Sequence, residues 1–216
     1  LWRFYSFLGK KKYLAINKNT DIVIEGFPRS ANTFAVVAFE KSQKTAVSIA
    51  HHLHVPSQIL QASKLEIPTI VLIREPVAAI CSFVIREPHI SLKAALNDYI
   101  TFYNTITPVK ESFVIAKFED VTSDYGKIIN EVNIKFGTNF SLFNHKVDSV
   151  NDVFSRLDSL EEEKKSGTTN ETKVARPSNT RKEIVEKISK RLTSEQFKKP
   201  LATAIKLYNK FLNTNQ

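Results

Sequence analysis

The stretch Asp21 to Phe39, DIVIEGFPRSANTFAVVAF, decides the fold. Ile22, Val23 and Ile24 are adjacent β-branched residues, a pattern typical of a short strand that is buried on both faces. From Ala35 onward the apolar residues continue without Gly or Pro, which favours a helix. A strand, a tight turn and a helix in this order aim free backbone N–H groups and the positive end of the helix dipole at an anion. The stretch therefore predicts a ligand that carries a phosphate.

The turn between the two apolar runs has the composition of a phosphate-binding loop. Gly26 permits a sharp exit from the strand, and Arg29 brings a positive charge. The Ser, Asn and Thr that follow bring short polar groups that can reach phosphate oxygens. The Walker A signature is absent, because no Gly-Lys-Ser/Thr follows the glycine at that spacing. An ordinary strand-to-helix connection with a capping Ser or Thr is the alternative interpretation.

A second segment, IPTIVLIREPVAAICSFVIR at Ile67 to Arg86, repeats this pattern. It predicts a strand over Thr69 to Ile73 and a helix over Val77 to Arg86. Arg74 lies at the carboxyl end of the predicted strand, where open parallel sheets bind ligands. Ser82 comes eight residues later, on the second turn of the helix. With this spacing both side chains could reach one phosphate.

In these two segments the chain resembles the sulfotransferases that use 3′-phosphoadenosine 5′-phosphosulfate (PAPS). Their 5′-phosphosulfate loop is commonly Pro-Lys/Arg-Ser-Gly-Thr-Thr/Asn, and this chain has Pro28 to Thr33, PRSANT, with Ala31 in place of the usual Gly. Their 3′-phosphate element is an Arg followed eight residues later by a Ser, the separation of Arg74 and Ser82. The similarity spans roughly residues 20 to 185.

Two weaker motifs extend the resemblance. Phe118-Glu119-Asp120 is similar to the Tyr-Glu-Asp strand end of the family, and Arg181-Lys182 to the start of its late Arg-Lys-Gly loop, with Glu183 where the Gly would be. The resemblance implies that backbone N–H groups of Ser30 to Phe34 cradle the 5′-phosphate. The nucleotide-binding residues that it implies are Pro28, Arg29, Ser30, Ala31, Asn32, Thr33, Phe34, Arg74, Ser82, Arg176, Arg181 and Lys182.

Three of the five histidines lie in one short segment, Ala50 to Pro56. The resemblance implies that His52 is the general base, because His-Leu here is similar to the His-Leu-Pro segment of cytosolic sulfotransferases. A His with a pKa near the working pH suits proton removal from an acceptor hydroxyl. His54 is the substitute candidate, and a purely structural role is the alternative. We expect no metal, because adjacent His51 and His52 without a Cys or carboxylate in the segment are a poor zinc site.

The composition bounds the remaining possibilities. The 216 residues are 42% hydrophobic and 25% charged, as in a soluble globular protein. No apolar run approaches the ~20 residues that cross a bilayer. The lone Cys81 excludes an intrachain disulfide and is typical of a reducing compartment, so we expect a cytoplasmic protein. The chain opens at Leu1 and contains no Met, which leaves a trimmed signal or anchor as an alternative.

The sequence predicts one domain over residues 1–216, with an apolar N-terminal arm at 1–20 and C-terminal helices over 183–213. Residues 155–180 are polar and rich in Glu, Lys, Ser and Thr, which predicts a mobile loop. This loop could close over a ligand and bring Arg176, Arg181 and Lys182 to it, or it could be a solvated linker. Further expected elements are strands over Thr45 to Ile49 and Phe113 to Phe118, and helices over Ser57 to Lys64, Ser91 to Ile106 and Ser123 to Phe136, the last capped by Thr122.

The strand and helix pattern predicts an α/β fold of three layers, with a central parallel sheet flanked by helices, similar to the P-loop NTPases. The resemblance implies a PAPS-dependent sulfotransferase that acts on a hydroxyl or amine of a small-molecule or glycan acceptor, with Arg29 balancing charge on the leaving phosphate. A P-loop small-molecule kinase and a non-enzymatic polyanion-binding module are the rivals. The net charge of +9 suits each of them, but the basic residues are dispersed, so we expect no nucleic-acid partner.

Overall fold

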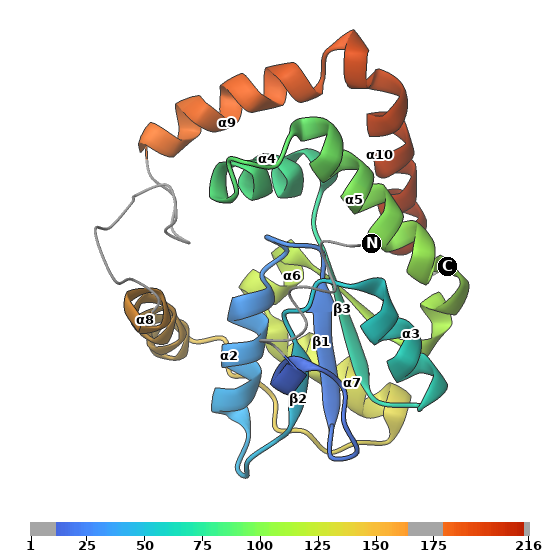
Figure 1. Ribbon diagram of the computed structural model, residues 1–216. Coiled ribbons are helices and arrows are strands. Elements are labelled where there is room, and N and C mark those ends of the chain that lie inside the picture. The colour runs from blue at the N-terminus through green and yellow to red at the C-terminus, as the bar shows by residue number, and fades with distance from the viewer. Residues whose placement is uncertain (1–11, 164–178, 214–216) are drawn as a thin grey trace.

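The fold is built on a parallel four-stranded sheet, seen in a computed structural model that describes residues 12–163 and 179–213 (Figure 1). The strands are β1 (Ile22–Gly26), β2 (Ile49–His51), β3 (Thr69–Ile73) and β4 (Val114–Lys117), in the order β2-β1-β3-β4. After β1, the chain forms β2 along one edge of β1 and then crosses to form β3 along the opposite edge of β1. The carboxyl ends of β1 and β3 thus form a switch point of the topology, where sheets of this class bind ligands.

Helices cover both faces of the sheet (Figure 1). Ile22 and Ile24 of β1 pack with Ile70 and Leu72 of β3 against one layer of helices, and Val71 and Ile73 pack against the other. The first layer contains α2 (Asn32–Ser42), α7 (Tyr125–Phe136) and α8 (Val147–Glu163). The second contains α3 (Pro56–Lys64), α4 (Pro76–Arg86), α5 (Leu92–Ile106), α9 (Asn179–Leu192) and α10 (Lys198–Leu212). The predicted three-layer α/β fold is confirmed.

Short elements complete the chain: η1 (Lys12–Leu14), η2 (Thr107–Ser112), α6 (Phe118–Ser123) and η4 (Glu195–Phe197). The described part of the predicted N-terminal arm packs through Leu14 against Leu53 and Val55, and residues 1–11 lie outside the described residues. None of the helices that the structure describes has the length and apolar character needed to span a bilayer. That the whole chain forms one domain stays a prediction.

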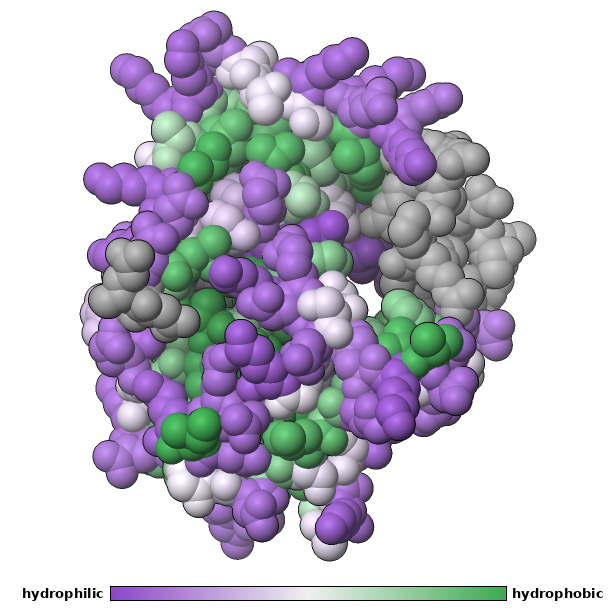
Figure 2. Space-filling view, turned by 180° about the vertical axis from the view of Figure 1, so that it is seen from behind, coloured by the Kyte–Doolittle hydropathy of each residue, from purple (hydrophilic) through white to green (hydrophobic). Residues whose placement is uncertain are grey.

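The C-terminal helices form an outer arch over α4 and α5 (Figure 1). Their inner side contributes Leu192, Leu201 and Phe211 to the core, and α9 packs directly against α4. Hydrophilic side chains line the edge of the molecule formed by these helices (Figure 2). The exposed basic residues there are Lys182, Lys187, Lys190, Arg191, Lys198, Lys199, Lys206 and Lys210. Much of the excess positive charge is therefore carried by this solvated arch.

The structure corrects three of the expected elements. The strand predicted over Thr45 to Ile49 begins only at Ile49, because Thr45 and Ala46 are exposed and do not pair with β1. Phe118 does not end a strand but begins α6. Thr122 is not a helix cap: it lies inside α6, and Asp124 caps α7 by accepting a hydrogen bond from the Lys127 backbone N–H at 3.3 Å.

The predicted mobile loop over 155–180 is wrong for residues 155–163, which belong to α8. Val153 and Leu157 of this helix are buried against Phe34 and its neighbours on α2. They recur at helical spacing, and this periodicity outweighs the polarity of the glutamates that follow. Residues 164–178 lie outside the described residues, and residues 179–182 begin α9.

We expect Gly26→Ala to destabilise the fold. A Cβ on residue 26 would lie 2.8 Å from Leu72 Cβ and would also meet the Leu72 carbonyl oxygen, so β1 and β3 would have to separate. Overpacking of this kind lowers the free energy of unfolding by about 1–3 kcal/mol, which urea denaturation would measure.

Gly137→Ala is the matched control. Gly137 has a φ of 65°, and a Cβ there meets nothing within 4 Å, so this variant reports the backbone cost alone, about 1 kcal/mol. A Gly26→Ala variant as stable as the wild-type protein would contradict the close approach of β1 to β3.

Candidate functional site

The loop that joins β1 to α2 holds its backbone in an uncommon conformation. Arg29 has a φ of 70° and Ala31 a φ of 69°, in the left-handed region that favours glycine. The Asn32 side chain donates from Nδ2 to the Phe27 carbonyl oxygen at 3.0 Å, which closes the turn. Strain of this kind persists where the surrounding structure enforces it, and it concentrates at binding sites.

The N-terminus of α2 is left without a side-chain cap. Its N-cap residue is Ala31, which has no polar side-chain atom and so makes no capping hydrogen bond. The first carbonyl-bonded amide of the helix is that of Ala35, which donates to the Ala31 carbonyl oxygen at 2.9 Å. The N–H groups of Asn32, Thr33 and Phe34 therefore have no acceptor within the helix. This end of α2 can bind an anion through its backbone and its dipole.

Two buried polar atoms of the loop also lack a hydrogen-bond partner among the described residues. They are Ser30 Oγ, in a side chain with no exposed surface, and Asn32 Oδ1, in a side chain that is 5% exposed. Burial raises the pKa of the Tyr103 phenol, and the nearby Ser30 side chain opposes this rise. The two hydroxyl groups are nevertheless not in hydrogen-bond geometry. Buried polar groups are rarely left unsatisfied, and of these two only the Ser30 hydroxyl can donate to an anion, because an amide oxygen can only accept.

The second predicted element lies at the carboxyl end of β3. The Arg74 guanidinium sits 4.0 Å above the ring of Phe118, at the start of α6. The Arg74 carbonyl oxygen accepts a hydrogen bond from the hydroxyl of Tyr99 on α5 at 2.8 Å, and Tyr103 binds the Leu72 carbonyl oxygen at 2.8 Å. Two buried tyrosines of α5 thus fix the strand end from which Arg74 projects.

The structure brings the two elements into direct contact. Arg29 donates from Nε to Ser82 Oγ at 3.0 Å, and Arg74 donates from Nη1 to the Arg29 carbonyl oxygen at 3.1 Å. Three residues from two distant segments of the sequence therefore meet at the switch point between β1 and β3. Ser82 is buried, so its hydroxyl is presented toward the loop and not toward bulk water.

The neighbouring helix α4 differs from α2 at its N-terminus. The Glu75 carboxylate accepts hydrogen bonds from the backbone N–H groups of Val77 at 3.0 Å and Ala78 at 2.7 Å. This cap satisfies the first amides of α4 and places a negative charge at its positive end. The end of α4 is therefore less suited to an anion than the uncapped end of α2.

The histidine segment lies beside the loop. His52 Nε2 is 3.1 Å from Thr33 Oγ1, and His52 Nδ1 is 2.5 Å from His51 Nδ1. His54 Nδ1 is 2.8 Å from the Gly26 carbonyl oxygen, which can only accept, so this nitrogen carries the proton. His52 has a φ of 56° and His54 a φ of 55°. Four of the five non-glycine residues with positive φ in the described chain thus belong to the loop and this segment.

A buried carboxylate, which sequence reasoning missed, holds this segment against β1. Glu25 has no exposed surface, and its carboxylate accepts from the Gly26 N–H at 3.1 Å, the Leu53 N–H at 2.9 Å and Gln58 Nε2 at 3.1 Å. Its Oε1 also lies 3.3 Å from His54 Nδ1. A charged residue inside an otherwise apolar strand was the signal that could have identified it.

The late candidates are only partly described. Arg176 lies outside the described residues. Arg181 and Lys182 are on the first turn of α9, and the Lys182 side chain is exposed. Because α9 packs against α4, these residues belong to the same layer as Ser82. Their contact with a nucleotide stays a prediction.

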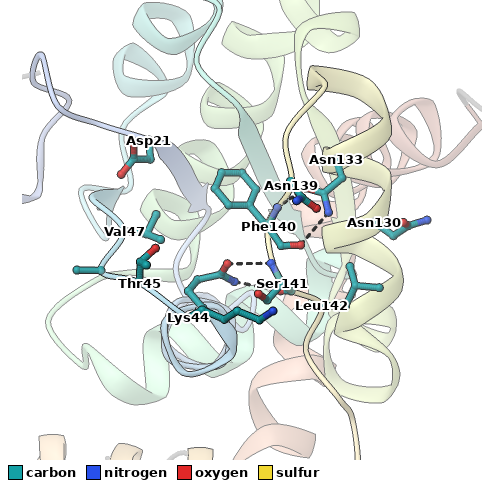
Figure 3. Close-up of a pocket in the computed structure, with 12 residues that line it drawn as sticks. Asp21, Lys44, Thr45, Val47, Asn130, Asn133, Asn139, Phe140, Ser141 and Leu142 are labelled. Atoms are coloured by element: carbon teal, nitrogen blue, oxygen red, sulfur yellow. Dashed lines mark hydrogen bonds between the residues drawn. The ribbon is translucent and has the colours of Figure 1, made fainter.

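A cavity of about 800 Å³ opens at the opposite end of the sheet, beside the amino ends of the strands (Figure 3). The Gln43 side chain crosses its wall, accepting from the Ser141 N–H at 3.0 Å and donating to the Ser141 carbonyl oxygen at 3.1 Å. Asn133 binds the Phe140 backbone in the same two-way manner. These amides are occupied in joining α2 and α7 to the 139–142 segment.

Among the described residues, no cluster of three or more His, Cys, Asp or Glu side chains could hold a metal ion.

Comparisons with known proteins give one kind of match. No protein-family model matches the chain, and no curated protein sequence matches it. Among solved structures, the chain is similar to the mouse sulfotransferase SULT7A1 complexed with PAP, with a TM-score of 0.51, 9% sequence identity, and coverage of 97% of this chain and 92% of that one. The protein therefore has the fold of the sulfotransferases, which is similar to that of the P-loop NTPases.

We expect Ala31→Gly to stabilise the protein, because glycine adopts the φ of 69° at this position without the steric cost that alanine incurs. After the larger entropy of an unfolded glycine is subtracted, the expected gain in the free energy of unfolding is about 0.5–1 kcal/mol. Chemical denaturation would measure it. Ala35→Gly, inside the same helix, is the control and should lose about 1 kcal/mol or more. A destabilised Ala31→Gly variant would contradict the described loop conformation.

Proposed function

We propose that this protein is a PAPS-dependent sulfotransferase, which moves a sulfuryl group to a hydroxyl or amine of a small-molecule or glycan acceptor. The observation that carries the proposal is the meeting of Arg29, Arg74 and Ser82 at the carboxyl ends of β1 and β3. Two adjacent cationic elements, one on a loop and one at a strand end, are suited to bind a ligand with two separate phosphate groups. The shared fold supports this interpretation.

The residues present fit such a nucleotide. The uncapped N–H groups of Asn32 to Phe34, the Ser30 hydroxyl and Arg29 are suited to the 5′-phosphate. Arg74 and Ser82 are suited to the 3′-phosphate. The Asn32 Nδ2 group already donates to the Phe27 carbonyl oxygen, and the Phe34 ring is buried against Phe143 and Phe154. Asn32 and Phe34 would therefore bind the phosphate through their backbone N–H groups.

The donor supplies the sulfuryl group: its S–O bond to the 5′-phosphate breaks, the electron pair stays on the phosphate oxygen, and the acceptor atom forms the new bond to sulfur. His52 takes the proton of the acceptor on Nε2, the nitrogen that already contacts Thr33 Oγ1 at 3.1 Å. Arg29 and the N–H groups at the start of α2 balance the charge that develops on the phosphate. The Glu25 carboxylate keeps the His segment beside the loop throughout.

His54 is the alternative base. Its Nδ1–H is held by the Gly26 carbonyl oxygen and the Glu25 carboxylate, an arrangement that leaves proton uptake to Nε2. We also place the protein in the cytoplasm, since its single cysteine, Cys81, can form no intrachain disulfide, as is typical of proteins in a reducing compartment.

Calorimetry with 3′-phosphoadenosine 5′-phosphate (PAP), ATP and an acidic polysaccharide separates this proposal from its rivals. We expect PAP to bind more tightly than either of the others, because it alone carries the 3′-phosphate that Arg74 and Ser82 would hold. Preference for ATP with Mg²⁺ would support a kinase. Binding of the polysaccharide alone, with a strong dependence on salt, would support a polyanion-binding module.

Arg74→Ala should weaken PAP binding by about 2–4 kcal/mol while barely changing the affinity for adenosine 5′-phosphosulfate, which lacks the 3′-phosphate. The matched control is Arg191→Ala, which removes an equal charge from an exposed position on α9 and should leave both affinities unchanged. Equal losses for the two nucleotides in Arg74→Ala would show that Arg74 acts on the loop through the Arg29 carbonyl oxygen and not on the 3′-phosphate.

His52→Ala should leave PAP affinity nearly intact and lower kcat about 100-fold or more, because a general base acts in the transition state. Steady-state kinetics at a saturating concentration of PAPS would measure the loss in kcat. Full activity in His52→Ala together with an inactive His54→Ala variant would transfer the role of base to His54.

A further inference from the structure

The two ring nitrogens of His52 are engaged on opposite sides. Nε2 is 3.1 Å from the hydroxyl oxygen of Thr33, and Nδ1 is 2.5 Å from Nδ1 of His51. The two imidazole rings are nearly perpendicular, at 81°, with their centroids 4.7 Å apart. His51 therefore meets His52 edge on, through the nitrogen that is not directed at the loop.

Two proton arrangements satisfy both contacts when the two histidines are neutral, because a neutral imidazole carries one N–H and one lone pair. In the first, His51 donates from Nδ1, so His52 carries its proton on Nε2 and donates to Thr33. In the second, His52 donates from Nδ1 to the lone pair of His51, and His52 Nε2 accepts from the Thr33 hydroxyl. Only the second leaves His52 Nε2 able to take up a proton.

We propose that His51 is a positioning residue for His52: its Nδ1 accepts the Nδ1–H of His52 and so holds His52 in the tautomer whose Nε2 is basic. This inference rests on the proposed function, because it is that function which requires a basic Nε2 and so selects the second arrangement; the tautomer itself can be measured in the protein without ligands. In the reaction, the proton of the acceptor goes to His52 Nε2, and the resulting imidazolium keeps its Nδ1–H on His51. His51 itself need not touch the acceptor.

The fold holds this pair firmly. His51 is the last residue of β2 and pairs with Ile24 of β1, so its backbone is part of the sheet. His52 follows with a φ of 56°, which turns its side chain relative to that of His51. Immediately beyond, the Leu53 N–H is bound by the buried Glu25 carboxylate at 2.9 Å. The backbone is thus anchored on both sides of the His51–His52 pair, so the contact between the two rings requires little further loss of conformational entropy.

The tautomer can be measured directly by nitrogen-15 NMR of histidine-labelled protein at about pH 8.5, where an ordinary histidine is neutral. Two-bond couplings to the carbon-bound ring protons identify each nitrogen, the nitrogen-15 chemical shifts then distinguish Nδ1–H from Nε2–H, and His52→Gln assigns the signal. We expect His52 to carry its proton on Nδ1. A His52 that carries it on Nε2 would overturn the proposal, whether or not the protein transfers sulfate.

Two substitutions at His51 test the cause. His51→Leu removes the acceptor, so the His52 signal should move toward a mixture of tautomers. His51→Asp offers only an acceptor, on an atom two bonds beyond Cβ as Nδ1 is, so the Nδ1–H tautomer should be restored. The control is His89→Leu, at a histidine whose side chain is 65% exposed beyond α4, and it should leave the His52 signal unchanged.

The same variants carry the kinetic test. His51→Leu should lower kcat about 10- to 100-fold with KM for PAPS nearly unchanged, and His51→Asp should recover most of that loss. Recovery by His51→Asp separates orientation from a merely structural role, since a packing defect would not be repaired by a carboxylate. Wild-type kcat in His51→Leu would overturn the kinetic part, whereas a wild-type protein that transfers no sulfate but shows the expected tautomer would disprove only the proposed function.

Discussion

The close pairing of β1 with β3 is the constraint on which the site depends. Gly26 lies so near Leu72 that no side chain fits between the strands, and this contact sets the separation of the two strand ends. The chain leaves β1 through a strained loop toward α2 and leaves β3 at Arg74, so Arg29 and Arg74 meet at the switch point. The tyrosines of α5 then fix the carbonyl groups of Leu72, in β3, and of Arg74, just after it, from the other face of the sheet.

Much of the fold could be predicted from the sequence, because its central strands and main helices are apolar runs bounded by Gly, Pro and polar residues. The strand over Thr69 to Ile73 was predicted with the bounds that the structure has. Edge elements were less accurate: β2 pairs through only three residues, and its place depends on contacts with β1 that local sequence does not reveal. Helix α8 could not be predicted from its composition, because its polar residues and terminal glutamates are typical of a loop, and only the buried Val153 and Leu157 give it a side that packs on α2.

The site divides in the same way. Arg29, Arg74 and Ser82 were selected by a family spacing, and the structure brings them together. Glu25 and the pairing of His51 with His52 could not be predicted in this way, because each depends on how β1 and β2 lie side by side. Phe118 was noted for its place in a motif, yet its contact with Arg74 follows from the start of α6 beside the end of β3. Sequence patterns identify the charged groups, and tertiary structure determines their partners.

The bonds from Arg29 to Ser82 and from Arg74 to the Arg29 backbone have a thermodynamic consequence. The loop and the strand end share these contacts. A ligand group that displaces Arg29 from Ser82 would therefore also change the hydrogen bonding and the electrostatic environment of Arg74. The two halves of a bisphosphorylated molecule would then not bind with additive free energies, and the difference would be a coupling free energy between two subsites that are in contact. Discrimination between nucleotides with one and with two phosphate positions would therefore reside in the linkage between the cations as much as in either cation alone.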